Sequence, residues 1–358
     1  MPRSTVARIN TSAIRQNYRK AVFLGHGAQA MAVIKADGYG HGIRDVALAL
    51  KDDAPKFAVA CIEEAQAIRD AGINHPVVLL QGPHSRDDIA TSASEGFEPV
   101  IHSDHQLDWL DQAQTAPTLW IKVNTGMNRL GFAPDDLERV MARLAGQGHG
   151  NNATGFVTHF ACADDTSSDF TARQTDCFLG AVSPWPDLEK SLGNSAAHFQ
   201  EGQSLFDWSR PGIMLYGGSP MIGKFGLDLD LEPAMTLEAE LTSVRTLKAG
   251  ESVGYGGSWK ASDETRMGIV AVGYGDGYPR HAGTDTPAWV NGSRIRLIGR
   301  VSMDMLAVDL SNAPDARPGD KVELWGKHIS VDEVAKHAGT IGYELLTGVT
   351  ARVPRVRE

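Results

Sequence analysis

The sequence predicts an α/β protein in which a (β/α)8 barrel is followed by a mostly β C-terminal domain. Between about residues 29 and 216, short apolar segments alternate with segments of helical period. After about residue 228, the segments show the alternation and β-branched content of strands. A chain of 358 residues is expected to hold two domains, which we place at residues 1–227 and 228–358.

Eight apolar runs with few interior charges are the candidates for the barrel strands, because parallel strands are buried on both faces. They are "AMAVIKA", "FAVACI", "PVVLLQG", "EPVIHS", "LWIKVN", "GFVTHF", "KSLGNSA" and "GIMLYG". Between them, "LERVMARL" has a helical apolar face behind Pro134, and "IEEAQAIRDAG" is expected to end at Gly72. Strands alternating with helices in this number favour a closed barrel over an open sheet.

The second domain is predicted from four strand-like segments, "MTLEAELTSVRTL", "RMGIVAVGYG", "AWVNGSRIRLIGRVSMDMLAVDL" and "DKVELWG". Asn291-Gly292 predicts a hairpin turn, since both residue types tolerate positive φ. One short helix is expected around "VDEVAKHA".

The composition excludes several classes of function. A net charge of −10 argues against nucleic-acid and anionic-membrane partners, which favour basic surfaces. No apolar run approaches the roughly 20 residues of a membrane span, and the start "MPRSTVARIN" lacks the apolar core of a signal peptide. The cysteines, Cys61, Cys162 and Cys177, form no metal-binding pattern, so we expect no metal and a cytoplasmic location.

Polar residues at the ends of the candidate strands meet at the catalytic face of a barrel. They are Lys35, Lys122, Asn124, His159, Asn194, Ser195 and Arg210. A lysine at a strand end is commonly a solvated charge, but Lys35 lies between an apolar run and a glycine-rich loop in "AVIKADGYGHG". Burial there would lower its pKa, which suits an amine that forms a Schiff base.

The other candidates each have a structural alternative. "GNSAAH" is consistent with a turn or helix cap, and equally with a phosphate site at backbone N–H groups. Arg210 could cap a strand or help bind an anion, and His159 could be structural or catalytic. Tyr255 and Tyr274 lie in glycine-rich turns, which are common in β proteins.

Eight separated motifs resemble those of the alanine racemases over essentially the whole chain. They are "AVIKADGYGHG", "KVNTGMNRLG", "THFACAD", "NSAA", "RPGIMLYG", "VGYG", "GYGDGYPR" and "GRVSMDM". The resemblance implies a pyridoxal 5'-phosphate (PLP) enzyme, an isomerase that interconverts L-alanine and D-alanine and supplies D-alanine for peptidoglycan. It also implies a homodimer whose active sites are shared between subunits.

By this resemblance, Lys35 holds PLP through a Schiff base, and Arg210 faces the pyridine nitrogen. The other cofactor-binding residues are Tyr39, Asn194, Ser195, Gly212 and Ile213. PLP stabilises a carbanion most strongly when its ring nitrogen is protonated. An arginine does not accept that proton, so the carbanion is expected to be brief, which suits reprotonation at Cα.

The resemblance also implies two bases on opposite faces of Cα. Lys35 acts for D-alanine and Tyr255 of the partner subunit for L-alanine, with Tyr255, His159 and Arg210 in a hydrogen-bonded chain. The substrate is held by Arg129, itself oriented by a carbamylated Lys122, and by Met303 and Asp304. Tyr274 lines the substrate channel together with Arg280 and Arg300.

One position departs from the family pattern. Many relatives have a tyrosine just before "RVPR", where this chain has Ala351, so the phosphate site is expected to lack one hydroxyl and the channel to be wider. A serine racemase or a racemase of broader specificity therefore stays an open alternative.

A non-catalytic PLP-binding barrel would lack the β domain. A PLP-dependent decarboxylase would present a glutamate to the ring nitrogen and a cysteine after Cys177, where this chain has none.

Overall fold

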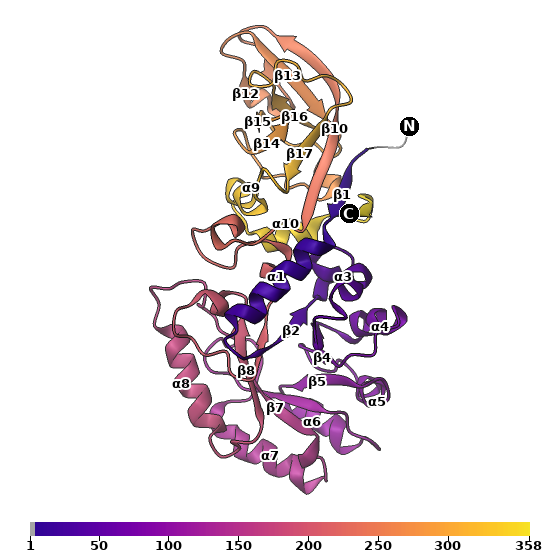
Figure 1. Cartoon of the computed structure of the whole chain (residues 1–358), viewed down its shortest axis with the longest axis vertical. Coiled ribbons are helices and arrows are strands. Elements are labelled where there is room, and N and C mark those ends of the chain that lie inside the picture. The colour runs from indigo at the N-terminus through magenta and orange to yellow at the C-terminus, as the bar shows by residue number, and fades with distance from the viewer. Residues whose placement is uncertain (1–3) are drawn as a thin grey trace.

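Eight parallel strands close into a barrel in chain order, as the sequence predicts (Figure 1). The computed structural model describes residues 4–358. The first three residues of "MPRSTVARIN", the start of the chain discussed above, lie outside the described residues. The barrel strands are β2 (Gln29–Val33), β3 (Lys56–Val59), β4 (Val77–Leu79), β5 (Phe97–Ile101), β6 (Leu119–Lys122), β7 (Ala153–Val157), β8 (Glu189–Asn194) and β9 (Trp208–Arg210). Pairing of β2 with β9 closes the barrel.

The helices of the barrel lie outside the strands (Figure 1). They are α1 (Thr11–Leu24), α3 (Ile43–Leu50), α4 (Ile62–Asp70), α5 (Arg86–Glu95), α6 (Asp104–Asp111), α7 (Leu137–Gly146) and α8 (Phe170–Val182). The short segment α2 (Lys35–Tyr39) is a left-handed turn that follows β2. Short 3-10 helices are η1 (Pro134–Asp136), η2 (Gly150–Asn152), η3 (Ala196–Phe199), η4 (Ile213–Tyr216) and η5 (Gly226–Leu229). Two helix predictions are confirmed: Pro134 opens the turn before α7, and Gly72, at φ +78°, follows the end of α4.

The eighth barrel strand is not the one expected. "GIMLYG" forms the 3-10 helix η4, and the strand is Trp208–Arg210, just before it. All four residues of η4 are buried, and Tyr216 donates a hydrogen bond to the carbonyl of Val33. The prediction was wrong because a short buried helix and a buried strand are equally apolar, so periodicity does not separate them.

A buried ion pair lies near the N-terminal ends of the barrel strands. Lys56 Nζ lies 2.9 and 2.6 Å from the two carboxylate oxygens of Glu98, which also accepts a hydrogen bond from Trp120 Nε1 at 2.8 Å. The ammonium lies 4.7 Å from the ring centroid of Trp208. These side chains fill that end of the barrel, so the site opens at the opposite, C-terminal end of the strands.

The C-terminal domain is built on an eight-stranded sheet in the order β13-β16-β15-β14-β17-β10-β1-β18. Its strands are β1 (Val6–Ile9), β10 (Met235–Leu247), β13 (Thr265–Val270), β14 (Pro287–Val290), β15 (Ser293–Leu297), β16 (Leu306–Asp309), β17 (Lys321–Trp325) and β18 (Arg355–Arg357). The strands β11 (Ser252–Val253) and β12 (Trp259–Lys260) form a separate small hairpin. The domain also contains two 3-10 helices, η6 (Tyr255–Gly257) and η7 (Tyr274–Asp276). The first strand of the chain thus lies between β10 and β18.

The turn between β14 and β15 is the predicted one, with Asn291 at φ 47° and Gly292 at φ 81°. The predicted helix is α9 (Val331–Ala338). A second helix, α10 (Gly342–Gly348), was not expected, and it lies between the two domains (Figure 1). It reaches the barrel, where Leu346 packs against Gly40.

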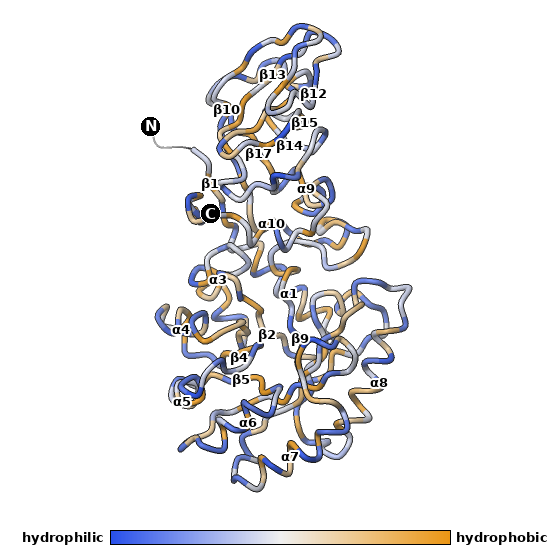
Figure 2. The backbone as a smooth tube through the Cα atoms, turned by 180° about the vertical axis from the view of Figure 1, so that it is seen from behind, coloured by the Kyte–Doolittle hydropathy of each residue, from blue (hydrophilic) through white to orange (hydrophobic). Residues whose placement is uncertain are grey.

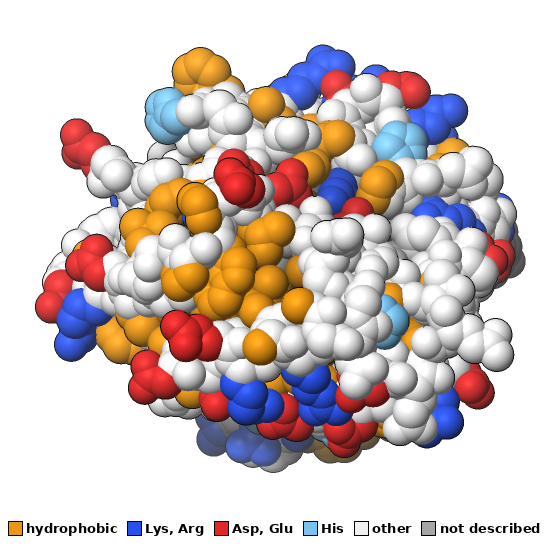
Figure 3. Space-filling view, turned by 90° about the horizontal axis from the view of Figure 1, so that it is seen from below, with side chains coloured by type: hydrophobic (Ala, Val, Ile, Leu, Met, Phe, Trp, Pro, Cys, Tyr) orange, Lys and Arg blue, Asp and Glu red, His pale blue; other side chains and the backbone are white. Residues whose placement is uncertain are grey.

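The distribution of hydrophobic and charged residues matches this architecture. Hydrophobic residues lie along barrel strands such as β4 and β5 (Figure 2). On the face seen from below, basic and acidic side chains are interspersed around an apolar centre (Figure 3). Within residues 4–358, no helix is long and apolar enough to cross a membrane.

Candidate active site

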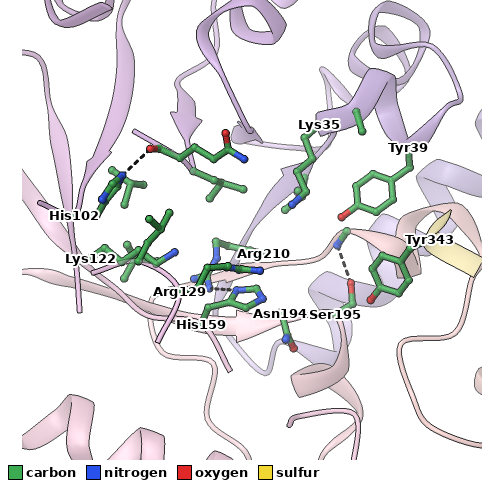
Figure 4. A pocket seen from close by; sticks show the side chains of 18 of the residues that line it. Lys35, Tyr39, His102, Lys122, Arg129, His159, Asn194, Ser195, Arg210 and Tyr343 are labelled. Atoms are coloured by element: carbon green, nitrogen blue, oxygen red, sulfur yellow. Dashed lines mark hydrogen bonds between the residues drawn. The ribbon is translucent and has the colours of Figure 1, made fainter. Parts of the chain in front are cut away.

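A cavity of about 1050 Å³ opens at the C-terminal ends of the barrel strands (Figure 4). Strand ends and the loops after them supply most of its wall, and α10 adds Tyr343. The predicted site residues that line it are Lys35, Tyr39, Lys122, Arg129, His159, Asn194, Ser195, Arg210, Gly212 and Ile213. Residues from five of the eight quoted motifs, all of them in the barrel, therefore line one cavity.

Lys35 follows the buried strand β2 directly, after Ile34. Its side chain points into the cavity toward Arg210 (Figure 4). The pKa of Lys35 is lowered, first by desolvation and then by the positive charge of Arg129. A larger share of the amine is therefore unprotonated near neutral pH, which is the form that acts as a nucleophile or base.

The residues after Lys35 form a left-handed turn. Ala36, Asp37, Gly38 and Tyr39 have φ values of 52°, 53°, 61° and 52°. Such backbone costs roughly 1–2 kcal/mol for each residue that is not glycine, so neighbouring contacts must hold it. Ala36 N donates to Glu64 Oε1 at 2.6 Å, and Ile43 N donates to Asp37 Oδ1 at 2.8 Å. His41 is neutral because burial lowers its pKa to about 4, and its Nδ1 donates to the carbonyls of Gly38 and Tyr39.

This turn places the Tyr39 hydroxyl beside Ser195 and Gly212. Gly212 N donates to Ser195 Oγ at 2.8 Å (Figure 4). A Cβ at position 212 would lie 2.5 Å from Tyr39 Oη, so a side chain here would push the Tyr39 hydroxyl out of its place. The hydroxyls of Tyr39 and Ser195 and the backbone at Gly212 thus form a cradle of polar groups of the kind that bind a phosphate.

Arg210, at the end of β9, is 5% exposed and is held by hydrogen bonds on several sides. Its Nη1 donates to Ser191 Oγ at 2.6 Å, and its Nη2 donates to the carbonyl of Thr158 at 2.6 Å and to His159 Nδ1 at 3.4 Å. Burial lowers the pKa of Arg210 to about 10, so the guanidinium remains a cation at neutral pH.

His159 is neutral in this environment. Desolvation and the positive charge of Arg210 hold its pKa well below the usual range. Because Nδ1 accepts from Arg210, the neutral ring carries its proton on Nε2. One end of the predicted Tyr255–His159–Arg210 chain is therefore present within a single chain.

Lys122 and Arg129 line the other side of the cavity. Desolvation and the charge of Arg210 lower the pKa of Lys122 to about 8. With Lys35 and Arg210, four basic side chains face one cavity in a chain of net charge −10. This concentration of positive charge predicts a ligand that carries anionic groups, such as a phosphate and a carboxylate.

The remaining predicted site residues lie on the C-terminal domain. Tyr255, Tyr274, Met303 and Asp304 are exposed, Tyr255 to 71%, and none belongs to the cavity wall within residues 4–358. Two of their loops are joined, since Gly275 N donates to the carbonyl of Met303 at 2.8 Å. Arg280 and Arg300 are also exposed on this domain. The structure thus separates the predicted site into a barrel group and a C-terminal group.

Tyr343 is a cavity residue that sequence reasoning missed. It comes from α10, and its ring lies 6.1 Å from that of Tyr39 (Figure 4). Ala351, by contrast, is exposed and is not part of the wall that residues 4–358 form. The expectation that Ala351 leaves the phosphate site short of one hydroxyl stays a prediction. Tyr343, eight positions earlier on α10, brings a tyrosine ring to the cavity that the sequence did not reveal.

Comparisons with known proteins agree with this geometry. Residues 9–220 match the family described as alanine racemase, N-terminal domain, and residues 234–357 match alanine racemase, C-terminal domain. An alanine racemase of Marinobacter nauticus is 66% identical over 100% of both chains. A biosynthetic alanine racemase of Pseudomonas aeruginosa is 47% identical, covering 99% of both chains.

Solved structures point the same way. The crystal structure of the biosynthetic alanine racemase from Pseudomonas aeruginosa matches with a TM-score of 0.95 and 46% identity, covering 99% of both chains. The alanine racemase from Acinetobacter baumannii matches with a TM-score of 0.93 and 37% identity, covering 99% of this chain and 100% of that one. The resemblance inferred from the sequence motifs is confirmed, and the chain belongs to the alanine racemase family.

Proposed function

We propose that this chain interconverts L-alanine and D-alanine with PLP bound in the barrel cavity. The observation that carries the proposal is a partly buried amine of lowered pKa, Lys35, beside a glycine-floored cradle of hydroxyls. Membership of the alanine racemase family over the full chain supports it.

The cavity residues fit PLP. Lys35 would hold its aldehyde carbon, and Arg210 would face its pyridine nitrogen. Tyr39, Ser195, Gly212 and Ile213 would hold its phosphate, with Asn194 and Tyr343 beside them. The room left by the missing side chain of Gly212 and the four basic residues of the wall support this assignment.

PLP supplies an electron sink that makes the Cα–H bond of a bound amino acid acidic. The chain's own residues then decide the outcome. Arg210 remains protonated at a pKa of about 10, so it offers N–H groups and does not act as an acid that would protonate the ring nitrogen. Lys35 would exchange a proton at Cα on one face, which its lowered pKa favours.

The opposite face requires a second base. We assign it to Tyr255 of the partner subunit, with Tyr274, Met303 and Asp304 of that subunit completing the substrate site and its channel. Their exposure on the C-terminal domain, away from their own chain's cavity wall, supports a shared site in a homodimer. The neutral His159, with its proton on Nε2, would link Tyr255 to Arg210.

Three broader proposals accompany this assignment. We propose a cytoplasmic location and a role in supplying D-alanine for peptidoglycan. We also propose a domain boundary after residue 227, which the mostly antiparallel sheet of the C-terminal domain supports. The strand β1, from the first segment of the chain, joins that sheet.

Arg129 would bind the substrate carboxylate, and Lys122 would orient it as a carbamate. A lysine amine reacts with carbon dioxide only when unprotonated, forming the N–C bond and releasing one proton. Since the pKa of Lys122 is about 8, we expect carbamate formation to rise as the pH increases through about 8, well below the usual lysine range near 10.4.

This expectation is measured by ¹³C NMR of the protein in ¹³C-labelled bicarbonate between pH 6 and 10. A carbamate signal should be present in the wild type and absent in Lys122→Arg. A signal that rose only near pH 10, or that survived in Lys122→Arg, would contradict the assignment.

Gly212→Ala tests the phosphate cradle. The added Cβ would clash with Tyr39 Oη, and overpacking of this kind costs about 1–3 kcal/mol. We expect PLP affinity to fall by roughly 5- to 150-fold, measured by absorbance titration of the apoprotein. Gly146→Ala is the matched control, because a Cβ there would meet no described atom within 4 Å. Equal PLP affinity in the two variants would remove position 212 from the cradle.

The proposed activity is tested by incubating the purified protein and PLP with a panel of L-amino acids, followed by chiral chromatography. Formation of D-alanine supports the proposal, and comparable formation of D-serine would extend it to a broader racemase. Release of carbon dioxide with an amine product would instead support a decarboxylase. Binding of PLP without turnover of any amino acid would indicate a non-catalytic PLP-binding protein.

A further inference from the structure

The left-handed turn that carries Tyr39 is followed by Gly40, which contacts the C-terminal end of the chain. A Cβ at Gly40 would lie 2.1 Å from the carbonyl oxygen of Leu346, so α10 packs directly on this backbone. One hydrogen bond also reaches Gly40 from outside the barrel: Arg355 Nε donates to the Gly40 carbonyl at 3.1 Å.

Arg355 is fixed on its other side by three further carbonyls. Nη1 donates to Thr350 O at 2.6 Å and to Val353 O at 2.9 Å, while Nη2 donates to Val349 O at 2.6 Å. The planar guanidinium is therefore held rigidly by the segment after α10 and presents its remaining edge to Gly40. Burial of this group lowers its pKa, in keeping with a side chain that is half-buried between the two domains.

The segment that holds Arg355 is itself anchored to the C-terminal domain. Thr350 N donates to Asp276 O at 3.0 Å, and Thr350 Oγ1 donates to Gly275 O at 3.0 Å. The Arg355 side chain thus links the turn after Lys35 to a segment that is anchored on the C-terminal domain. A lysine at this position would retain the charge but would lack the fork that satisfies these carbonyls together.

We propose that Arg355 is a positioning residue for the cofactor site. It holds the Gly40 carbonyl, which keeps the turn from Ala36 to Tyr39 in its left-handed form and the Tyr39 hydroxyl against Gly212. The turn needs such support, since non-glycine residues in this conformation are strained. The proposal rests on the PLP site described above and assigns Arg355 no contact with PLP or substrate.

The test compares Arg355→Met and Arg355→Lys with Arg357→Met, an exposed arginine on the same strand. The first readout is the PLP dissociation constant of the apoprotein. We expect about a tenfold or greater increase for Arg355→Met, a smaller increase for Arg355→Lys, and no change for Arg357→Met. The second readout is hydrogen exchange of the apoprotein, in which the amides of residues 36–42 should exchange faster in Arg355→Met.

A double-mutant cycle with Tyr39→Phe separates positioning from general destabilisation. If Arg355 acts through Tyr39, the loss of affinity caused by Arg355→Met should shrink strongly in the Tyr39→Phe background. Equal factors in both backgrounds would overturn the proposal. A lower melting temperature with unchanged PLP affinity and unchanged exchange of residues 36–42 would also overturn it.

Arg355→Lys keeps the cycle usable if the methionine variant does not fold. Failure of the wild-type apoprotein to bind PLP would refute the proposed function. Normal PLP binding by wild type and by both Arg355 variants would refute this inference alone.

Discussion

Lys35→Ala is expected to abolish racemisation in both directions and to remove the visible absorbance of bound PLP. Loss of one general base costs about 10²–10⁴-fold, and here the same amine is also the proposed covalent anchor. We therefore expect a loss at or beyond the upper end of that range. Chiral chromatography with added PLP measures the rate, and absorbance after gel filtration measures retention of the cofactor.

The control for this variant is Lys336→Ala, which removes an exposed lysine from α9. It should keep both the absorbance and the wild-type rate. Unchanged colour together with substantial racemisation by Lys35→Ala would exclude Lys35 from both roles.

Tyr255→Phe is expected to lower racemisation by about 10²–10⁴-fold while PLP stays bound, because it removes the proposed base on one face of Cα only. The rates fall in both directions, since each direction needs both proton transfers. In D₂O, however, the variant should still exchange the Cα proton of D-alanine through Lys35. Proton NMR of D-alanine and chiral chromatography of the same samples measure exchange and inversion separately.

Tyr278→Phe is the matched control in the same domain. The Tyr278 hydroxyl is buried and has no hydrogen-bond partner within residues 4–358, so its removal should leave both rates unchanged. Near-wild-type inversion by Tyr255→Phe would refute the two-base assignment.

Mixing these two inactive variants tests whether the site is shared. A heterodimer of Lys35→Ala with Tyr255→Phe would contain one site with both bases intact and one site with neither. After subunit exchange in equal amounts, about a quarter of wild-type activity should return, because half of the dimers are mixed and each has one good site. No recovery, despite mass-spectrometric evidence of mixed dimers, would place both bases in one chain.

The barrel site was largely predictable because its chemistry is encoded locally. A buried strand followed by a lysine and a glycine-rich loop indicated Lys35, the resemblance to the family implied Tyr39, and both line the cavity. The positive φ of Ala36, Asp37 and Tyr39 was not predictable. Non-glycine residues adopt it because contacts from outside the turn, made by Glu64 and Ile43, hold them there.

One wrong prediction and one omission arose where the local sequence pattern is ambiguous. The run "GIMLYG" is as apolar as a buried strand, and only its place beside α1 and β2 makes it the 3-10 helix η4. Tyr343 was missed because it reaches the cavity through α10, a helix that the sequence did not indicate. The spacing of residues along the sequence does not show which face of α10 packs against the barrel cavity.

The sequence by itself determined the alternation of strands and helices, the change to an antiparallel domain, the anchoring lysine and the family. These depend on periodicity and on short motifs whose residues interact with near neighbours. Only the tertiary structure decided that Tyr343 lines the cavity, that a Cβ at Gly212 would meet the Tyr39 hydroxyl, and that Arg355 reaches Gly40. Such contacts join residues far apart in the chain, and their geometry is set by barrel closure and domain packing.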